Sequence, residues 1–264
     1  ALAAAVGASV CEIYTDVEGV LTADPRLVPK AGLIPRISYE ECLELASLGA
    51  QVIHSRAVEL GELYRMPIHV RSSAHRRPGT MILPEAEIDM EERKRVRGIA
   101  HEYGVAKVTV KGVPDQPGVA AAILEPLSEA GVSVDVIVQN ISTHQKVDLT
   151  FTCAESDLPR VEPLVREAAT QTGALEVLLA IGAAKVSLIG TGMVGAPGVA
   201  ARMFRTLATA RVNIQMITTA EIRITCLVDH DEVERAVRAL HVAFQLDEDE
   251  EEVGQDSGTV ALCP

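Results

Sequence analysis

An internal repeat in the second half of the chain limits its fold more than any other feature. The segment AKVTVKGVPDQPGVAAAILEPLSEAGVSVDVI returns further along as AKVSLIGTGMVGAPGVAARMFRTLATARVNIQMI. Lys107 matches Lys185, and after a two-residue insertion the PGVA of 117–120 matches that of 197–200. Self-similarity of this length indicates two copies of one structural unit.

Each copy has the pattern strand, Pro-Gly turn, helix, strand, strand, helix. The first copy predicts strands at 106–111, 134–139 and 148–152, a helix at 158–170 and a closing strand at 175–179; the second predicts strands at 185–189, 213–218 and 222–228 and a helix at 231–240. This order is the ferredoxin-like βαββαβ arrangement. Asp231 and Glu234 have the spacing of a helix N-cap and its capping-box partner.

Residues 1–73 alternate helical and strand patterns. The Ala-rich opening predicts a helix, 11–15 a strand, and Ser38 with Glu41 the capping box of a further helix. A helix around 52–64 and a short strand at 68–70 complete the pattern. Strands that alternate with helices indicate an α/β layer with a parallel sheet.

The region boundaries follow from changes in composition. Residues 74–95 are rich in proline and charge, which predicts a linker. The repeat copies then occupy 96–180 and 181–246. The last segment, 247–264, has seven acidic residues and no Lys or Arg, which predicts a disordered acidic tail; a partner-binding role is the alternative.

Composition excludes several classes of protein. The formal net charge is −13 and the chain without its tail is still negative, which argues against nucleic acid as the main partner. The longest apolar run, 177–184, is far shorter than the roughly 20 residues of a membrane span. The five cysteines are scattered and form no CxxC pair, which favours reduced thiols in a cytoplasmic protein. The histidines show no metal-ligand spacing, so no metal site is predicted.

The segment ALAAAVGASV at residues 1–10 has the apolar character of a signal peptide but shows no basic n-region. It also continues directly into the strand pattern at 11–15. We therefore expect an internal helix of a longer protein, of which this chain is a fragment.

The Pro-Gly loop of the first copy is a candidate binding site. A helix that begins near Gly118 offers unpaired backbone N–H groups, and these favour a carboxylate. Asp115 in the same loop could hold an ammonium group, so the pair suits a free amino acid. The alternative is that Asp115 only caps the helix. The glycines of GTGMVGAPG at 190–198 are explained by the repeat, not by a dinucleotide fingerprint.

Another candidate site follows the strand at 11–15. Thr15 and Asp16 lie where ligands bind in open α/β sheets, just past the end of a strand. Asp24-Pro25-Arg26 forms a rigid turn that presents an arginine suited to polyphosphate. A solvated turn with an Asp cap is the alternative.

At these residues the sequence resembles a known family. CEIYTDVEGVLTADPRLV, ISYEECLELASLGAQVIHSRAVELGELYRMPIHVRSS and PGTMI resemble the C-terminal half of the aspartate kinase catalytic domain. The repeat, with VPDQPGVAAAIL and NIQMITTAEIRIT, resembles the two ACT regulatory modules of that family. The resemblance implies an α/β fold: a partial amino-acid-kinase domain followed by two ferredoxin-like ACT modules.

The resemblance implies an activity. The family transfers the γ-phosphoryl group of ATP, with Mg²⁺, to L-aspartate, giving 4-phospho-L-aspartate for lysine, threonine and methionine synthesis. Thr15 and Asp16 would then bind the nucleotide and Arg26 would approach its phosphates, whereas Leu21 replaces the usual Tyr. His54-Ser55 stands where His-Pro is usual.

The family's Lys-Phe-Gly-Gly segment is not among these 264 residues. We therefore expect no catalytic residues in the chain and no activity of the chain alone. The alternative is a non-catalytic, amino-acid-sensing regulatory subunit. Another amino-acid kinase, such as glutamate 5-kinase, is disfavoured because tandem ACT modules do not accompany it.

The resemblance also implies an effector site for lysine, threonine or both, between paired modules of a homo- or hetero-oligomer. Ala220 replaces a frequent Ser of that site. The positions that match the family's effector contacts are Asp115, Gly118, Val119, Ala120, Ser133, Val134, Asp135 and Gln139 in the first module, and Val199, Ala200, Asn213, Ile214 and Ala220 in the second.

Overall fold

The computed structural model describes residues 1–48, 52–89, 94–141, 146–193 and 196–247. The chain divides into two compact units. The described residues of the first unit fall within 1–100, 188–206 and 237–247, and those of the second within 101–187 and 207–236. The predicted acidic tail, apart from Asp247, lies outside the described residues.

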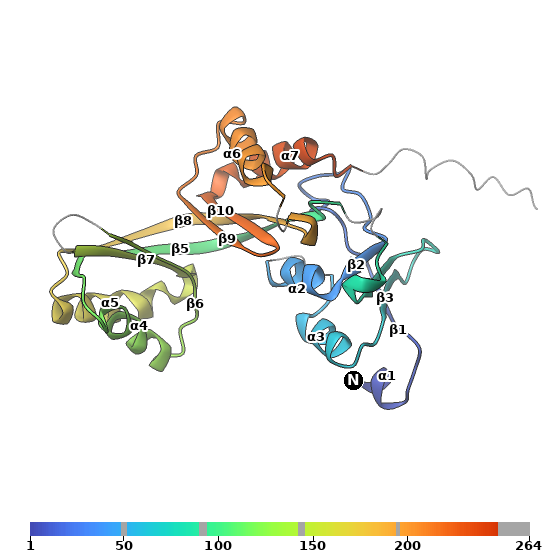
Figure 1. The fold of residues 1–264 in the computed structure, drawn as a ribbon, viewed down its shortest axis with the longest axis horizontal. Coiled ribbons are helices and arrows are strands. Elements are labelled where there is room, and N and C mark those ends of the chain that lie inside the picture. The colour runs from blue at the N-terminus through green and yellow to red at the C-terminus, as the bar shows by residue number, and fades with distance from the viewer. Residues whose placement is uncertain (49–51, 90–93, 142–145, 194–195, 248–264) are drawn as a thin grey trace, which may run out of the picture. The chain divides into compact units, whose positions relative to one another are not determined.

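The first unit contains a four-stranded sheet with helices beside it (Figure 1). Its elements are α1 (Leu2–Ala5), β1 (Cys11–Thr15), β2 (Arg36–Ser38), α2 (Tyr39–Ser47), α3 (Ser55–Leu63), β3 (Ile68–Ser72) and β4 (Thr80–Leu83), followed by the short 3₁₀ turn η1 (Glu85–Glu87). The sheet order is β1-β3-β4-β2. The capping box is confirmed: Ser38 Oγ accepts from Glu41 N, and a Glu41 carboxylate oxygen accepts from Ser38 N.

The sheet of the first unit is mixed, although the sequence predicts a parallel one. β1 pairs with β3 and β2 with β4 in parallel, but β3 and β4 are antiparallel. The connection between β3 and β4 is the short loop 73–79, whereas a parallel pair needs a crossover of a dozen or more residues. The loop length therefore determines the antiparallel pairing.

The segment 74–95, which the sequence predicts as a linker, supplies an interior strand. β4 lies between β3 and β2, and its Ile82 is fully buried. Thr80 is also fully buried, and its hydroxyl is satisfied there because it donates to Ile34 O at 2.7 Å and accepts from Val20 N at 2.9 Å. Four residues among prolines and charges carry no periodic signal, so the composition concealed this strand.

The repeat forms one six-stranded sheet. Its strands are β5 (Gly98–Pro114), β6 (Val134–Ile141), β7 (Lys146–Ala154), β8 (Glu176–Ile189), β9 (Met216–Ala220) and β10 (Arg223–Asp229). Its helices are α4 (Val119–Glu129), α5 (Leu158–Thr172), α6 (Val199–Thr209) and α7 (Val233–Phe244), with 3₁₀ turns η3 (Glu155–Asp157), η4 (Thr191–Met193) and η5 (His230–Glu232). Asp231, predicted as a helix N-cap, instead lies inside η5, and α7 begins at Val233.

The sheet order is β6-β7-β5-β8-β10-β9, and equivalent strands of the two repeat copies lie at equal distances from its centre. β5 matches β8, β7 matches β10 and β6 matches β9. Figure 1 shows β5 and β8 as long neighbouring strands. The predicted closing strand of the first copy and opening strand of the second are thus one continuous strand, β8.

The second copy has no described strand of its own after α7, within residues up to 247. The beginning of β5 takes that place. Val105 of β5 packs against Ala183 of β8 and Leu227 of β10. Each long strand therefore contributes to both copies of the repeat.

The first copy has a core of small and branched aliphatic side chains, as a chain with 3% aromatic residues requires. Phe151 of β7 is its one fully buried aromatic side chain among the described residues, and α4 and α5 supply Ile123, Leu127, Val161 and Val165. In the described part of the chain, no helix combines the length and the apolar character that crossing a membrane requires.

Candidate functional site

The first candidate site lies at the carboxyl edge of β1 and β3. The two strands are parallel, so Thr15 and Ser72 end at the same edge of the sheet. Thr15 Oγ1 donates to Asp16 Oδ1 at 3.0 Å, and Asp16 is exposed. The N–H and hydroxyl of Ser73 both donate to Thr15 O, at 2.8 and 3.0 Å. Sequence reasoning missed Ser72 and Ser73, although two serines after a parallel neighbouring strand signal the same edge.

The turn at 24–26 is closed by its own ion pair. Asp24 accepts from the backbone N–H of Arg26 at 2.9 Å and from its guanidinium at 2.6 Å. The Arg26 side chain is 84% exposed, so the guanidinium faces water while it remains paired. Leu21, a few residues earlier, forms an isolated bridge with Leu33. The solvated Asp-capped turn is thus the geometry observed, and it leaves Arg26 accessible.

Thr22 connects this loop to the end of α7 within the first unit. Its hydroxyl donates to Leu246 O at 2.9 Å and accepts from Gly32 N at 2.9 Å. Since a hydroxyl has one proton, the 2.9 Å contact to His241 requires Nε2 of the imidazole to donate. Nδ1 of the fully buried ring then faces Asp247 Oδ1 at 3.2 Å without a hydrogen bond.

Burial lowers the pKa of His241, against the opposing effect of Asp247, which raises it. The imidazole is therefore neutral at neutral pH, with a proton on Nε2 only.

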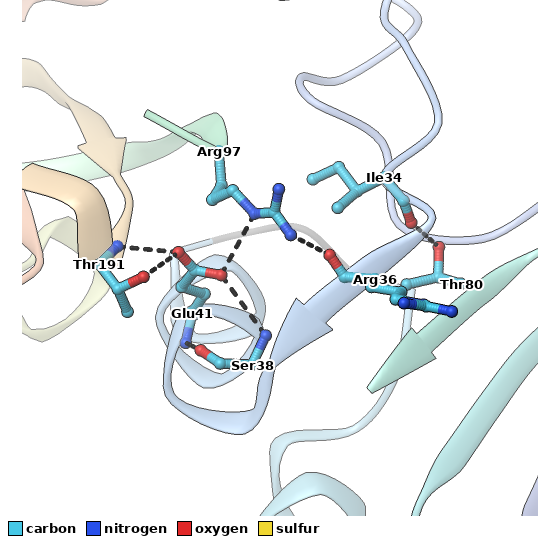
Figure 2. Close-up of polar contacts among 7 residues, drawn as sticks. All are labelled: Ile34, Arg36, Ser38, Glu41, Thr80, Arg97 and Thr191. Carbon is cyan, nitrogen blue, oxygen red and sulfur yellow. Dashed lines mark hydrogen bonds and ion pairs between the residues drawn. The ribbon is translucent and has the colours of Figure 1, made fainter. Parts of the chain in front are cut away.

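Glu41 of α2 is a buried carboxylate with partners from three segments of the first unit (Figure 2). One oxygen accepts from Thr191 N at 2.8 Å and from Thr191 Oγ1 at 2.9 Å. The other lies 3.4 Å from Arg97 Nε and accepts from Ser38 N. The Arg97 guanidinium also donates to Arg36 O. These contacts fix the start of α2 to the residues just before β5 and just after β8.

The four cysteines that the structure describes are free. Burial raises the pKa of Cys42, beside Glu41, and of Cys226 to about 12. Thiols this hard to ionise are poor nucleophiles and poor metal ligands, so a structural role fits them.

The second candidate site is the Pro-Gly loop in the second unit. α4 begins at Val119, and its N-cap Gly118 has a left-handed backbone with φ of 92°. The loop borders a cavity of 350 Å³. Its lining residues are Val113, Pro114, Asp115, Gln116, Pro117, Gly118, Val119, Ala120, Gln139, Val147 and Leu149.

This cavity offers opposite charges to a small ligand. The first-turn N–H groups of α4 supply hydrogen-bond donors and the positive end of the helix dipole. Asp115 is exposed, and among the described residues its carboxylate has no hydrogen-bond or ion-pair partner. It therefore does not cap α4 here. Gln139 of β6 also lines the cavity.

The structure brings together only part of the predicted effector set. Asp115, Gly118, Val119, Ala120 and Gln139 line the cavity. The others lie elsewhere: Ser133, Val134 and Asp135 at the start of β6, Val199 and Ala200 at the start of α6 in the first unit, Asn213 and Ile214 before β9, and Ala220 at its end. Asp135 pairs with Lys185 at 2.5 Å instead of lining the cavity.

Family models match three parts of the chain. The amino acid kinase family matches residues 1–72, and two ACT domain models match 108–170 and 186–244. The curated aspartokinase of Pseudomonas aeruginosa is 46% identical over 247 residues, which is 94% of this chain and 60% of that protein. The chain thus spans about 60% of the length of the curated relatives it matches.

The solved structures that resemble this chain are also aspartate kinases or their regulatory subunits. Clostridium acetobutylicum aspartate kinase matches with a TM-score of 0.85 at 28% identity, over 92% of this chain and 56% of that one. Aspartokinase III of E. coli in complex with lysine and aspartate matches with a TM-score of 0.72 at 28% identity, over 92% and 53%. The regulatory subunit of aspartate kinase from Thermus thermophilus is 34% identical, with a TM-score of 0.54, over 57% of this chain and 99% of that subunit. This chain therefore belongs to the aspartate kinase family, with part of an amino acid kinase domain followed by two ACT domains.

Proposed function

We propose that this chain is the C-terminal catalytic part and the regulatory part of an enzyme that phosphorylates L-aspartate with ATP. The product would be 4-phospho-L-aspartate, the first intermediate towards lysine, threonine and methionine. The cavity beside Asp115 is the observation that carries the regulatory part of this proposal, since it pairs amide donors with one accessible carboxylate. The family membership supports the reaction.

The nucleotide would bind at the edge formed by Thr15 and Asp16. Hydroxyl and carboxylate oxygens there suit the ribose and amino groups of a nucleotide, and the exposed Arg26 guanidinium suits its phosphates. Among the described residues no group of three or more His, Cys, Asp or Glu side chains could hold a metal ion. Mg²⁺ would enter with the phosphates, as part of the substrate.

The effector would be lysine, threonine or both. The carboxylate of a free amino acid would accept from the first-turn amides of α4, and its ammonium group would pair with Asp115. Aspartokinase III of E. coli, which is similar to this chain, has been crystallised with lysine and aspartate. The second loop, GMVGAPG, has no acid, so the two loops are not equivalent sites.

The 264-residue polypeptide would bind effector without turning over aspartate, because it spans about 60% of its curated relatives. The alternative is a non-catalytic regulatory subunit. The similarity of this chain to the Thermus thermophilus regulatory subunit supports that alternative. The kinase match over 1–72 favours the enzyme. An in-frame Lys-Phe-Gly-Gly segment in the upstream DNA would decide between them. The free, buried cysteines support a cytoplasmic location.

The deciding experiment is calorimetric titration of lysine and of threonine into the chain and into Asp115→Ala. Loss of one partner of a desolvated charge pair costs about 2–4 kcal/mol, which corresponds to roughly 30- to 1000-fold in affinity. Glu125→Ala, an exposed acid on α4 outside the cavity, is the matched control and should bind normally. Failure of the wild-type chain to bind either amino acid, or equal affinities in Asp115→Ala and wild type, would reject the effector site.

A coupled ADP-release assay tests the catalytic half separately. We expect no aspartate-dependent ADP release from the pure 264-residue polypeptide at any effector concentration. Aspartate-dependent turnover would contradict this part of the proposal and leave the effector part standing.

A further inference from the structure

The pseudo-symmetry of the repeat exposes a difference between two equivalent lysines. Lys185 of β8 is buried, with 7% of its side chain exposed. Its ammonium lies 2.8 Å from Glu102 Oε2 and 2.5 Å from Asp135 Oδ2. Burial would lower the pKa of Lys185, but the hydrogen bonds and charges of Asp135 and Glu102 raise it above its ordinary value. This ammonium is fully neutralised by the protein.

Lys107 of β5 holds the same place in the other copy, but both carboxylates are missing there. The residue that matches Asp135 is Gln215, and the residue that matches Glu102 is Ala180. Gly104 and Gly182, two residues after each of the latter positions, share a left-handed backbone with φ of 71° and 74°, which supports this alignment.

Lys107 Nζ donates to the neutral Gln215 Oε1 at 3.0 Å. In the described part of the chain it pairs with no carboxylate. A half-buried lysine side chain is thus left without a carboxylate partner, and burying such a group is costly unless an anion approaches it.

A cavity of 330 Å³ lies beside Lys107 within the second unit. Its lining residues are Lys107, Thr109, Val138, Asn140, Thr150, Gln215, Met216 and Ile217. Lys107 is the one charged side chain in this lining. Two hydroxyls and two carboxamides add hydrogen-bond donors, and Val138 and Met216 give apolar walls. The volume is at the small end of metabolite pockets.

We propose that this cavity binds a small organic acid that carries no amino group, with its carboxylate on Lys107 Nζ. The Thr109 and Thr150 hydroxyls, 3.0 Å apart, and the Asn140 carboxamide would complete the hydrogen bonds. An amino acid is disfavoured here because no acidic side chain lines the cavity to pair with its ammonium. The Asp115 cavity, in contrast, favours an amino acid, because Asp115 can pair with the ammonium group. This proposal does not rest on the proposed function.

The test is calorimetric titration of the full chain with succinate, at an ionic strength held constant with sodium chloride. We expect saturable binding to the wild-type chain. Gln215→Glu installs the counter-ion that Asp135 provides in the other copy, so succinate should bind at least tenfold more weakly. Lys107→Met should weaken binding at least as much. Lys111→Met removes an exposed lysine of the same strand and is the matched control, which should bind as the wild type does.

Two further arms exclude other sources of a signal. Asp115→Ala should bind succinate normally, which separates this cavity from the proposed effector site. Light scattering on wild type and Gln215→Glu should give equal masses, because the anion is a free acid and not a side chain of a second copy. No saturable wild-type binding, succinate affinity unchanged in Gln215→Glu, or dissociation of an oligomer by Gln215→Glu would each overturn the proposal.

Discussion

Among single residues, Lys185 and His241 are both buried and ionisable, but their surroundings act on them in opposite directions. Burial disfavours the charged form of each. Lys185 overcomes it through two direct hydrogen bonds to carboxylates, so its pKa rises. Among the described residues His241 faces one carboxylate, Asp247, which is 49% exposed; its effect raises the pKa but does not offset burial, so the pKa falls. The number and geometry of the charged partners therefore decide whether the pKa of a buried group rises or falls.

Replacement of Lys185 should destabilise the second unit. Lys185→Met leaves Glu102 and Asp135 close together without a cation. We expect a loss of about 1–3 kcal/mol, less than the roughly 3–5 kcal/mol of a fully buried pair, because both carboxylates are nearly half exposed. Thermal melts followed by circular dichroism measure this. Lys107→Met, at the equivalent place without carboxylates, is the control, and an equal loss in both variants would contradict the account.

His241 should make the stability of the first unit depend on pH. The unfolded histidine takes up a proton near its ordinary pKa of about 6.5, whereas burial delays this in the folded chain. The unfolded state then binds more protons, so the free energy of unfolding falls as the pH is lowered through about 6.5 and is insensitive to this group above it.

Melts at pH 8.0 and 5.5, followed by tyrosine fluorescence, test this prediction, since three of the four tyrosines, Tyr14, Tyr39 and Tyr64, lie in the first unit. His241→Gln should reduce the difference between the two melts. His75→Gln, at an exposed site, should not. An identical pH dependence in wild type and His241→Gln would exclude His241 as its source.

At the scale of elements, the start of α2 depends on Glu41. Glu41→Gln keeps the size of the side chain but removes the charge that faces Arg97. Arg97 would then lose the Glu41 carboxylate and keep its hydrogen bond to Arg36 O. We expect the first unit to lose about 2–4 kcal/mol, between the cost of a charged hydrogen bond and that of a broken buried ion pair.

Urea unfolding followed by tyrosine fluorescence measures the effect of Glu41→Gln. Glu40→Gln, the exposed neighbour in the same helical turn, is the matched control and should cost below about 1 kcal/mol. Similar midpoints for the two variants would show that the contacts to Thr191 and Arg97 contribute little to stability.

Local sequence signals predicted the elements well and their long-range partners poorly. The Ser38–Glu41 capping box and the strand at 11–15 are read within a few residues, and both are confirmed. Glu41 also binds Thr191, 150 residues away, and no local pattern encodes that contact. β4 was missed because a buried strand of four residues is too short to show a recognisable alternation of apolar and polar side chains. At the first candidate site, Thr15 was recognisable from its own strand, whereas Ser73 depends on which strand becomes the neighbour.

At the scale of the whole molecule, the repeat predicted two modules but not their shared sheet. The sequence places the copies one after the other, which suggests two closed units. The structure instead runs β5 and β8 through both copies (Figure 1). The sequence of a strand shared by two modules differs from that of an ordinary strand only in length, because the alternation of apolar and polar residues continues through both halves. The result is a six-stranded sheet with two free edges, β6 and β9.

These two edges lead to a prediction about assembly. Ile137 of β6 and Ile217 of β9 occupy equivalent positions in the repeat and are 48% and 43% exposed. Unpaired backbone groups beside exposed apolar side chains are a template for pairing with another chain. We expect the chain to dimerise through its ACT domains at micromolar concentration, by pairing of these edges. Light scattering during gel filtration should therefore give a dimer mass.

A charge at either edge should reverse this association. Ile137→Lys or Ile217→Lys places an ammonium where the edges would meet, and desolvating it opposes pairing, so we expect a shift towards the monomer mass. Both side chains are about half exposed, so the fold should tolerate either change, and circular dichroism would verify this. Leu63→Lys, at a 72% exposed position on α3, is the matched control and should leave the dimer intact. A monomeric wild type, or a dimer that survives both edge substitutions, would rule out edge pairing and require another surface for assembly.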